Sequence, residues 1–226
     1  MDINIFLIHG FCGNILQFYP LKWTLNKRGY KNIHILNYPS TKVNLIEATE
    51  IINNQINNII KKSNNKKIIL ISHSFGGIIS YNLIDTFEIS LLILIASPIK
   101  KCSILNKITS VLPNKLNNLI LNTIPALQDL KDLQNLHIDN NKININIPYF
   151  TITTNLFYTN SFDGLIYLQD AIIDLDKNIN ITNSSHNLLL FNKKFLKTIG
   201  NLLDSHFINL NVVENNIVKI DYNNNI

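Results

Sequence analysis

Residues 67–84 read KIILISHSFGGIISYNLI, and this stretch decides the fold class. It begins with a continuous apolar run, residues 68–71, which is typical of a strand that is buried on both faces. The turn Ser72-His73-Ser74-Phe75-Gly76-Gly77 follows, and the mainly apolar stretch 78–84 then predicts a helix. A buried strand, a tight turn and a helix form the repeating unit of a doubly wound α/β sheet.

The same alternation of strand and helix recurs along the chain. Further strands are predicted at residues 3–8, 33–38, 91–96, 149–153 and 179–181, and further helices at residues 18–26, 44–62 and 195–203, the last before an Asn-rich tail. We therefore predict an α/β, doubly wound, mostly parallel β-sheet with helices on both faces. The 226 residues, 46% of them hydrophobic, suit a single domain spanning 1–226.

The pattern changes between the fourth and fifth predicted strands. Amphipathic helical pieces at 104–112, 116–124 and 127–136 replace it, and they predict a helical cap insertion at about 99–147. Its Ile and Leu residues either line a hydrophobic channel or pack on the sheet, and the sequence leaves both open. The lysines around it raise the hypothesis of contact with anionic lipid; they are Lys100, Lys101, Lys107 and Lys115.

Ser74 lies at the centre of the turn, as in a G-x-S-x-G nucleophile elbow, although Ser72 replaces the leading glycine. The elbow needs small residues two before and two after the serine, where strand and helix pass closely, and Ser72 and Gly76 are small. At a helix N-terminus, unpaired N–H groups favour developing negative charge. The alternative is an ordinary serine cap at a turn.

The loop after the first strand, His9-Gly10-Phe11, supplies a second part of the same chemistry. The backbone N–H of Phe11 and that of Phe75 are the expected pair of donors for a tetrahedral oxyanion.

A serine nucleophile needs a base, and the base needs an orienting carboxylate. Asp163 follows the strand at 149–153, and His186 follows the strand at 179–181, so the order Ser, Asp, His is complete. The glycine after Asp163 favours it over the rival acids Asp170, Asp174 and Asp176. The weaker histidines are His34 in a strand, His137 and His206 near helix ends, and His73, which is expected to point away from the partner of the serine.

Other classes of function are disfavoured by composition. The two cysteines and the histidines have no metal-ligand spacing, so we expect no metal and no cofactor. The net charge of +5 comes from scattered lysines, which argues against nucleic-acid binding. No secretory signal or run long enough to span a bilayer is evident, so a cytoplasmic protein, at most peripheral to a membrane, is expected.

Together these segments resemble the α/β-hydrolase superfamily, and more narrowly the lipase and esterase branch related to GPI-inositol deacylases and bacterial triacylglycerol lipases. The segments that carry the resemblance are IHGFCGN (8–14), LNKRGY (25–30), SHSFGG (72–77), ASP (96–98), PALQDL (125–130), FDG (162–164) and SH (185–186). Two departures are Ser72 and the absence of His and Gly after Pro98.

The resemblance implies Ser74 as nucleophile, His186 as general base and acid, and Asp163 as its orienting carboxylate, with the N–H groups of Phe11 and Phe75 as oxyanion donors. It implies hydrolysis of carboxylic esters, of lipids or other apolar acyl substrates, through an acyl-enzyme on Ser74. An acyltransferase or thioesterase would use the same triad, and a non-catalytic binding protein would keep only the fold.

Overall fold

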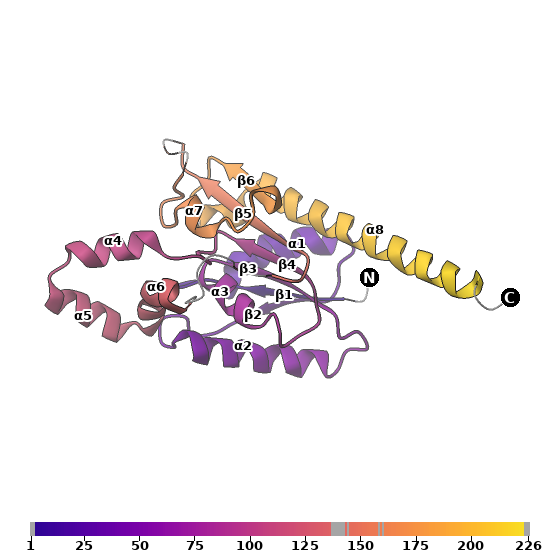
Figure 1. The fold of residues 1–226 in the computed structure, drawn as a ribbon, viewed down its shortest axis with the longest axis horizontal. Coiled ribbons are helices and arrows are strands. Elements are labelled where there is room, and N and C mark those ends of the chain that lie inside the picture. Colours follow the sequence, from indigo (N-terminus) through magenta and orange to yellow (C-terminus); the bar gives the residue numbers. More distant parts are fainter. Residues whose placement is uncertain (1–2, 137–142, 144, 158, 160, 224–226) are drawn as a thin grey trace.

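The computed structural model describes residues 3–136, 143, 145–157, 159 and 161–223 (Figure 1). Its centre is a six-stranded sheet in the order β2-β1-β3-β4-β5-β6, and every neighbouring pair of strands is parallel. The strands are β1 (Asn4–Ile8), β2 (Ile33–Leu36), β3 (Ile68–His73), β4 (Ile89–Ile95), β5 (Tyr149–Asn155) and β6 (Asn178–Thr182). The predicted doubly wound α/β fold is confirmed.

Helices cover both faces of this sheet because its central strands are apolar on both sides. Ile5 and Leu7 of β1 belong to one buried cluster with α1 (Tyr19–Lys27) and α8 (Lys193–Asn223). Phe6 and Ile8 belong to the other cluster, with α2 (Leu45–Ile60) and α3 (Phe75–Asn82). Alternate residues of a strand point to opposite faces, so β1 contributes to both layers.

Local signals in the sequence fix the ends of these helices. Asn44 accepts a hydrogen bond from the Glu47 N–H while the Glu47 carboxylate accepts from the Asn44 N–H, a capping box that starts α2. After α1, Gly29 takes φ +94°, the left-handed conformation that ends a helix at low steric cost.

Three helices lie between β4 and β5: α4 (Ser103–Val111), α5 (Asn114–Thr123) and α6 (Pro125–Leu136). They fall where the sequence predicts a cap, and they differ in burial. Ala126, Leu130 and Leu133 of α6 pack into the core cluster of α2 and α3. α4 contributes no buried side chain and α5 only Leu121. In Figure 1, α4 and α5 extend away from the sheet as a hairpin.

Two expectations about the C-terminal region were wrong. The final helix does not end at residue 203 but continues as α8 to Asn223, and His206 lies within it and not near a helix end. Short elements complete the fold: the single turns η1 (Ile15–Phe18), η2 (Leu175–Lys177) and η3 (Leu188–Phe191), and α7 (Leu168–Ala171). None of the helices in the described part of the chain is both long enough and apolar enough to cross a bilayer.

Candidate active site

Ser74 occupies the sharp turn between β3 and α3. Its φ of +54° and ψ of −124° lie in a region that residues other than glycine rarely adopt, and its N–H donates to the Ile95 carbonyl at 2.8 Å. Strain of this kind costs about 1–3 kcal/mol and persists where the surrounding structure imposes it. Ser74 is partly exposed between two buried elements, so the turn lifts its side chain out of the sheet.

Close packing explains the small residues around Ser74. A Cβ on Gly76 would lie 2.5 Å from the His9 carbonyl oxygen and 2.6 Å from that of Ile8, so only glycine lets α3 pass the end of β1. A Cβ on Gly10 would lie 2.7 Å from the Ser74 Cβ. The backbone of residues 9–10 therefore runs directly beside the serine.

The departure at Ser72 has a structural explanation. This side chain is completely buried, and its Oγ lies 2.5 Å from the Oγ of Ser80 in α3. A buried hydroxyl is costly unless it is hydrogen-bonded. Ser80 supplies that bond, so serine can stand where the motif has glycine.

The structure brings Asp163 and His186 together. The Asp163 Oδ2 accepts a hydrogen bond from the His186 Nδ1 at 2.7 Å, and both side chains are buried. The two loops are also joined through the backbone, because the His186 N–H donates to the Asp163 carbonyl at 2.9 Å. The imidazole is thus held with its Nδ1 on the carboxylate, which leaves Nε2 as the nitrogen able to exchange a proton.

The second carboxylate oxygen of Asp163 is also occupied. Its Oδ1 accepts from the backbone N–H of Leu165 at 2.9 Å and of Ile166 at 2.6 Å. Gly164, at φ +100°, makes the tight turn that brings these N–H groups back to the carboxylate. Three donors therefore fix the orientation of Asp163.

His73 contradicts one expectation, since it does not point away from the histidine of the pair. Its Nε2 lies 3.2 Å from the His186 carbonyl oxygen, and the two rings are 4.6 Å apart. Burial, and next the charge of His186, lower the pKa of His73 well below its ordinary value. A neutral ring that donates from Nε2 has a lone pair on Nδ1, and no other described residue forms a hydrogen bond with this buried nitrogen.

His73 is the residue before Ser74, so this contact joins the elbow to the loop of His186. The hydrogen bonds of the described residues include none between the Ser74 hydroxyl and His186. The arrangement consists of a fixed Asp163–His186 pair and a serine on an adjoining elbow.

Phe11 and Phe75 flank the serine from two elements. Phe75 is the first residue of α3, where backbone N–H groups have no partner inside the helix. Phe11 follows Gly10, which contacts Ser74. In the turns, loops and caps of the described residues, neither N–H donates to another backbone group. Both N–H groups are therefore available to an oxygen atom.

The support of the Phe11 loop was not predicted from the sequence. His9 is buried, its ring lies 3.0 Å from both the Gly10 carbonyl oxygen and the Asn37 Oδ1, and it stacks on Tyr38 at 4.6 Å. The Tyr38 hydroxyl donates to the His9 carbonyl at 3.0 Å, and burial lowers the pKa of His9. The available signal was the polar pair Asn37-Tyr38 at the end of the neighbouring strand.

The rival acids have other contacts. Asp170 is completely buried, and its carboxylate accepts from the N–H and Oγ of Ser103 at the start of α4. Asp174 accepts from the Tyr149 hydroxyl at 2.6 Å, and Asp176 lies on the surface. The described residues contain no group of three or more side chains suited to hold a metal ion.

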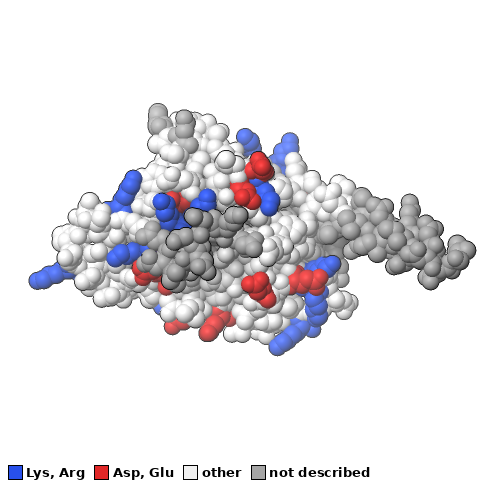
Figure 2. All heavy atoms as spheres, in the orientation of Figure 1, with Lys and Arg blue, Asp and Glu red and all other residues white. Residues whose placement is uncertain are grey.

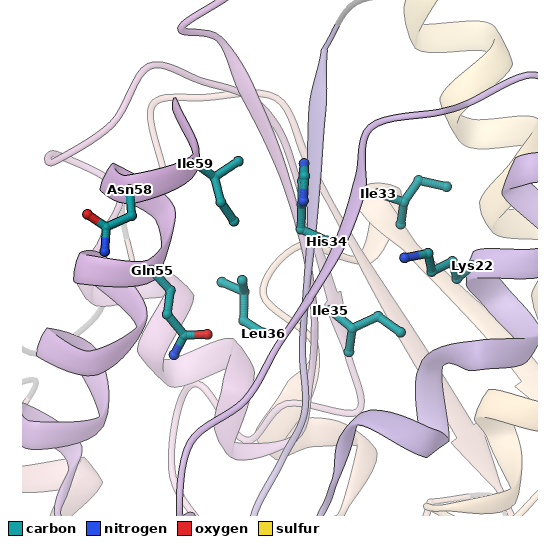
Figure 3. A pocket seen from close by; sticks show the side chains of 8 residues that line it. All are labelled: Lys22, Ile33, His34, Ile35, Leu36, Gln55, Asn58 and Ile59. Carbon is teal, nitrogen blue, oxygen red and sulfur yellow. The ribbon is translucent and has the colours of Figure 1, made fainter. Parts of the chain in front are cut away.

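His34 and His206 lie away from the elbow. His34 of β2 lines a pocket of about 450 Å³ between α1 and α2, and none of the predicted site residues lines that pocket (Figure 3). His206 contacts the Ser90 Oγ at 2.6 Å, and His137 falls outside the described residues.

The parallel sheet, with a serine at a strained strand-to-helix turn and a histidine–aspartate pair in neighbouring loops, matches the α/β-hydrolase fold. A family model described as the PGAP1-like alpha/beta domain matches residues 40–149, just under half of the chain. No curated protein matches the sequence. The chain has the fold of α/β-hydrolases, and lipases and esterases are among the solved structures to which it is similar.

The mature lipase BlEst2 of Bacillus licheniformis is 18% identical, with a TM-score of 0.62 over 92% of this chain and 91% of the lipase. A monoacylglycerol lipase of Paleococcus ferrophilus is 14% identical, with a TM-score of 0.62 over 89% of this chain and 94% of the lipase.

The phospholipase PlaB of Legionella pneumophila is 15% identical, with a TM-score of 0.58 over 76% of this chain. The chain spans 46% of that phospholipase, and 47% of the propeptide form of BlEst2. At these identities the likeness establishes the fold.

Proposed function

We propose that the chain is a serine hydrolase of carboxylic esters, with Ser74 as nucleophile, His186 as general base and acid, and Asp163 as the residue that orients His186. The observation that carries the proposal is the buried 2.7 Å bond between the Asp163 Oδ2 and the His186 Nδ1, next to a serine at φ +54°. The lipase and esterase names among the structural relatives support an ester as substrate.

The chemistry follows from these positions. The Ser74 Oγ attacks the ester carbonyl carbon while the His186 Nε2 takes its proton, and the carbonyl π electrons move to oxygen. The N–H groups of Phe11 and Phe75 stabilise that oxyanion. His186 then protonates the leaving alkoxide, and water deacylates the enzyme by the same steps. Asp163 keeps Nδ1 protonated throughout, so Nε2 is free to act.

The apolar helices between β4 and β5 support an apolar acyl group. α6 packs its buried side chains on the core and brings the segment to the same edge of the sheet as Ser74, the carboxyl ends of the parallel strands. Ligands of open α/β sheets bind at this edge. Lipids and other esters with apolar acyl chains are the proposed substrates.

The test is hydrolysis of p-nitrophenyl esters from two to sixteen carbons by the wild type, by Ser74→Ala and by Ser161→Ala, which removes an exposed hydroxyl. We expect Ser74→Ala to lose at least about 10³-fold in kcat/KM and Ser161→Ala to stay close to wild type. A fluorophosphonate probe should label the wild type and Ser161→Ala but not Ser74→Ala. Labelling of Ser74 without ester turnover would favour an acyltransferase or thioesterase, and no labelling would favour a binding protein.

A further inference from the structure

The α4–α5 hairpin, residues 103–123, exposes a set of apolar side chains that no other part of the described chain covers. α4 has no buried residue and α5 has one, Leu121. The exposed fractions are high for apolar residues: Val111 81%, Leu119 63%, Ile108 47% and Leu116 44%. Within each helix the two members are three residues apart and share a face.

The charged side chains of the hairpin and of the residues that flank it in sequence are all lysines. Residues 98–128 contain four lysines, at positions 100, 101, 107 and 115, and no aspartate or glutamate. Figure 2 shows blue but no red side chains at the outer end of the hairpin on the face in view. Lys100 is close enough to Asp174 to affect its pKa, and the Lys107 Nζ donates to the Tyr167 hydroxyl at 3.1 Å. Lys115 lies exposed at the start of α5.

Two carboxylates fix the base of the hairpin to the α/β core. Asp170 accepts from the Ser103 N–H at 2.8 Å and from its Oγ at 2.9 Å, where α4 starts. Asp129 of α6 accepts from the Leu45 N–H at 2.6 Å, at the start of α2. The hairpin is therefore held at both ends and projects beyond the sheet as a preformed element (Figure 1).

We propose that this hairpin is a docking surface for a lipid bilayer that contains anionic headgroups. Exposed Ile, Leu and Val side chains beside lysines suit the interface of a membrane, where apolar groups enter the acyl boundary and ammonium groups reach lipid phosphates. A second copy of the chain is a poorer partner, because two hairpins would bring their lysines together without acidic residues to pair them. This inference does not depend on Ser74 chemistry.

Vesicle sedimentation tests the proposal, with phosphatidylcholine alone and with phosphatidylcholine and phosphatidylglycerol at a ratio of about 3:1. We expect binding to the anionic vesicles that weakens with added salt. The double variant Val111→Ser/Leu119→Ser should have a partition coefficient about tenfold or more below that of the wild type. The double variant Lys107→Gln/Lys115→Gln should show a decrease of similar size on the anionic vesicles. The catalytic variant Ser74→Ala should bind like the wild type, which separates this test from that of the proposed function.

Matched controls are Leu175→Ser, which removes a side chain that is 80% exposed outside the hairpin, and Lys31→Gln. Both should leave the partition coefficient unchanged, and circular dichroism checks that every variant is folded. Equal binding by hairpin and control variants would overturn the proposal, as would binding to neither vesicle. A dimer in sedimentation velocity that Val111→Ser/Leu119→Ser abolishes would also overturn it and assign the face to a second copy.

Discussion

Replacing Asp163 by asparagine separates the role of this carboxylate in orienting His186 from its role in holding its own loop. The N–H groups of Leu165 and Ile166 donate to Oδ1 at 2.9 and 2.6 Å. In Asp163→Asn these two donors select the amide oxygen, so the amide NH₂ must face the His186 Nδ1. The imidazole then accepts at Nδ1 and carries its proton on Nε2, the tautomer that cannot take a proton from Ser74.

The expected loss in kcat is about 10⁴-fold, or about 5.5 kcal/mol in activation free energy, as for other triads whose aspartate becomes asparagine. The folded state should be little affected, since the amide oxygen still accepts both backbone bonds. Asp163→Ala instead leaves the N–H groups of Leu165 and Ile166 without this acceptor, and the loss at the buried Ile166 N–H should cost about 1–3 kcal/mol in free energy of unfolding. At this chain length each kcal/mol lowers the Tm by about 2–4 °C.

The assay measures kcat and kcat/KM on p-nitrophenyl butyrate, together with the Tm of each variant. Asp170→Asn is the control, because Asp170 is equally buried but binds Ser103. It should lower the Tm and leave kcat/KM within about threefold of wild type. The reasoning is refuted if Asp163→Asn keeps more than about a tenth of the wild-type kcat/KM, or if Asp170→Asn loses as much activity as Asp163→Asn.

Three further predictions concern the elbow and the buried histidines. Ser72→Ala and Ser80→Ala each leave a buried hydroxyl unpaired, so a double-mutant cycle measured by urea unfolding should give a coupling of about 1 kcal/mol, and additive effects would contradict the pairing. Gly10→Ala places a Cβ 2.7 Å from that of Ser74 and should reduce fluorophosphonate labelling of Ser74; labelling at the wild-type rate would show that the loop shifts freely. Burial lowers the pKa of His9 and His73 in the folded state, so the unfolded chain binds more protons than the folded one at acidic pH. The free energy of unfolding should therefore fall as the pH drops below about 7, through the histidine pKa of about 6.5 in the unfolded chain. The slope should reach up to about 1.4 kcal/mol per pH unit for each histidine. Urea unfolding from pH 8 to pH 5 should show this slope and a shallower one in His73→Asn; equal slopes in the two proteins would contradict it.

The sequence predicts the sheet and the elbow because their signals are local. An apolar run of β-branched residues followed by Ser72–Gly77 specifies strand, turn and helix within a few positions. The pairing of Asp163 with His186 was predicted from chain order, and the 2.7 Å bond is consistent with it. The glycine after Asp163 was an informative signal, since the turn at Gly164 brings two N–H groups onto the carboxylate.

Features that depend on distant contacts were not predicted. The orientation of the His73 ring depends on its contact with the His186 carbonyl, 113 residues further along the chain. The position of the His9 ring depends on Asn37 and Tyr38, which follow β2. The periodicity of α4 and α5 predicts amphipathic helices, but whether an apolar face meets protein or solvent depends on which helix reaches the sheet. In the structure α6 adds fully buried side chains to the core, whereas α4 packs only the partly buried Ile104 and Leu105 against it.

Asp163 and Asp170 show how two similar carboxylates differ in role. Both are buried, and they lie seven residues apart between β5 and β6, Asp163 in a loop and Asp170 in α7. One binds the ring of His186, and the other binds the N-terminus of α4. Burying a carboxylate is costly unless hydrogen-bond donors surround it. Both carboxylates meet this condition, Asp163 with donors from Leu165, Ile166 and His186, and Asp170 with donors from Ser103. An asparagine at position 163 can accept the two backbone hydrogen bonds. It cannot hold His186 in the tautomer that has its proton on Nδ1. The two carboxylates are equally buried, so their hydrogen-bond partners account for the difference in role. Asp163 acts through His186, and Asp170 fixes the start of α4 through Ser103.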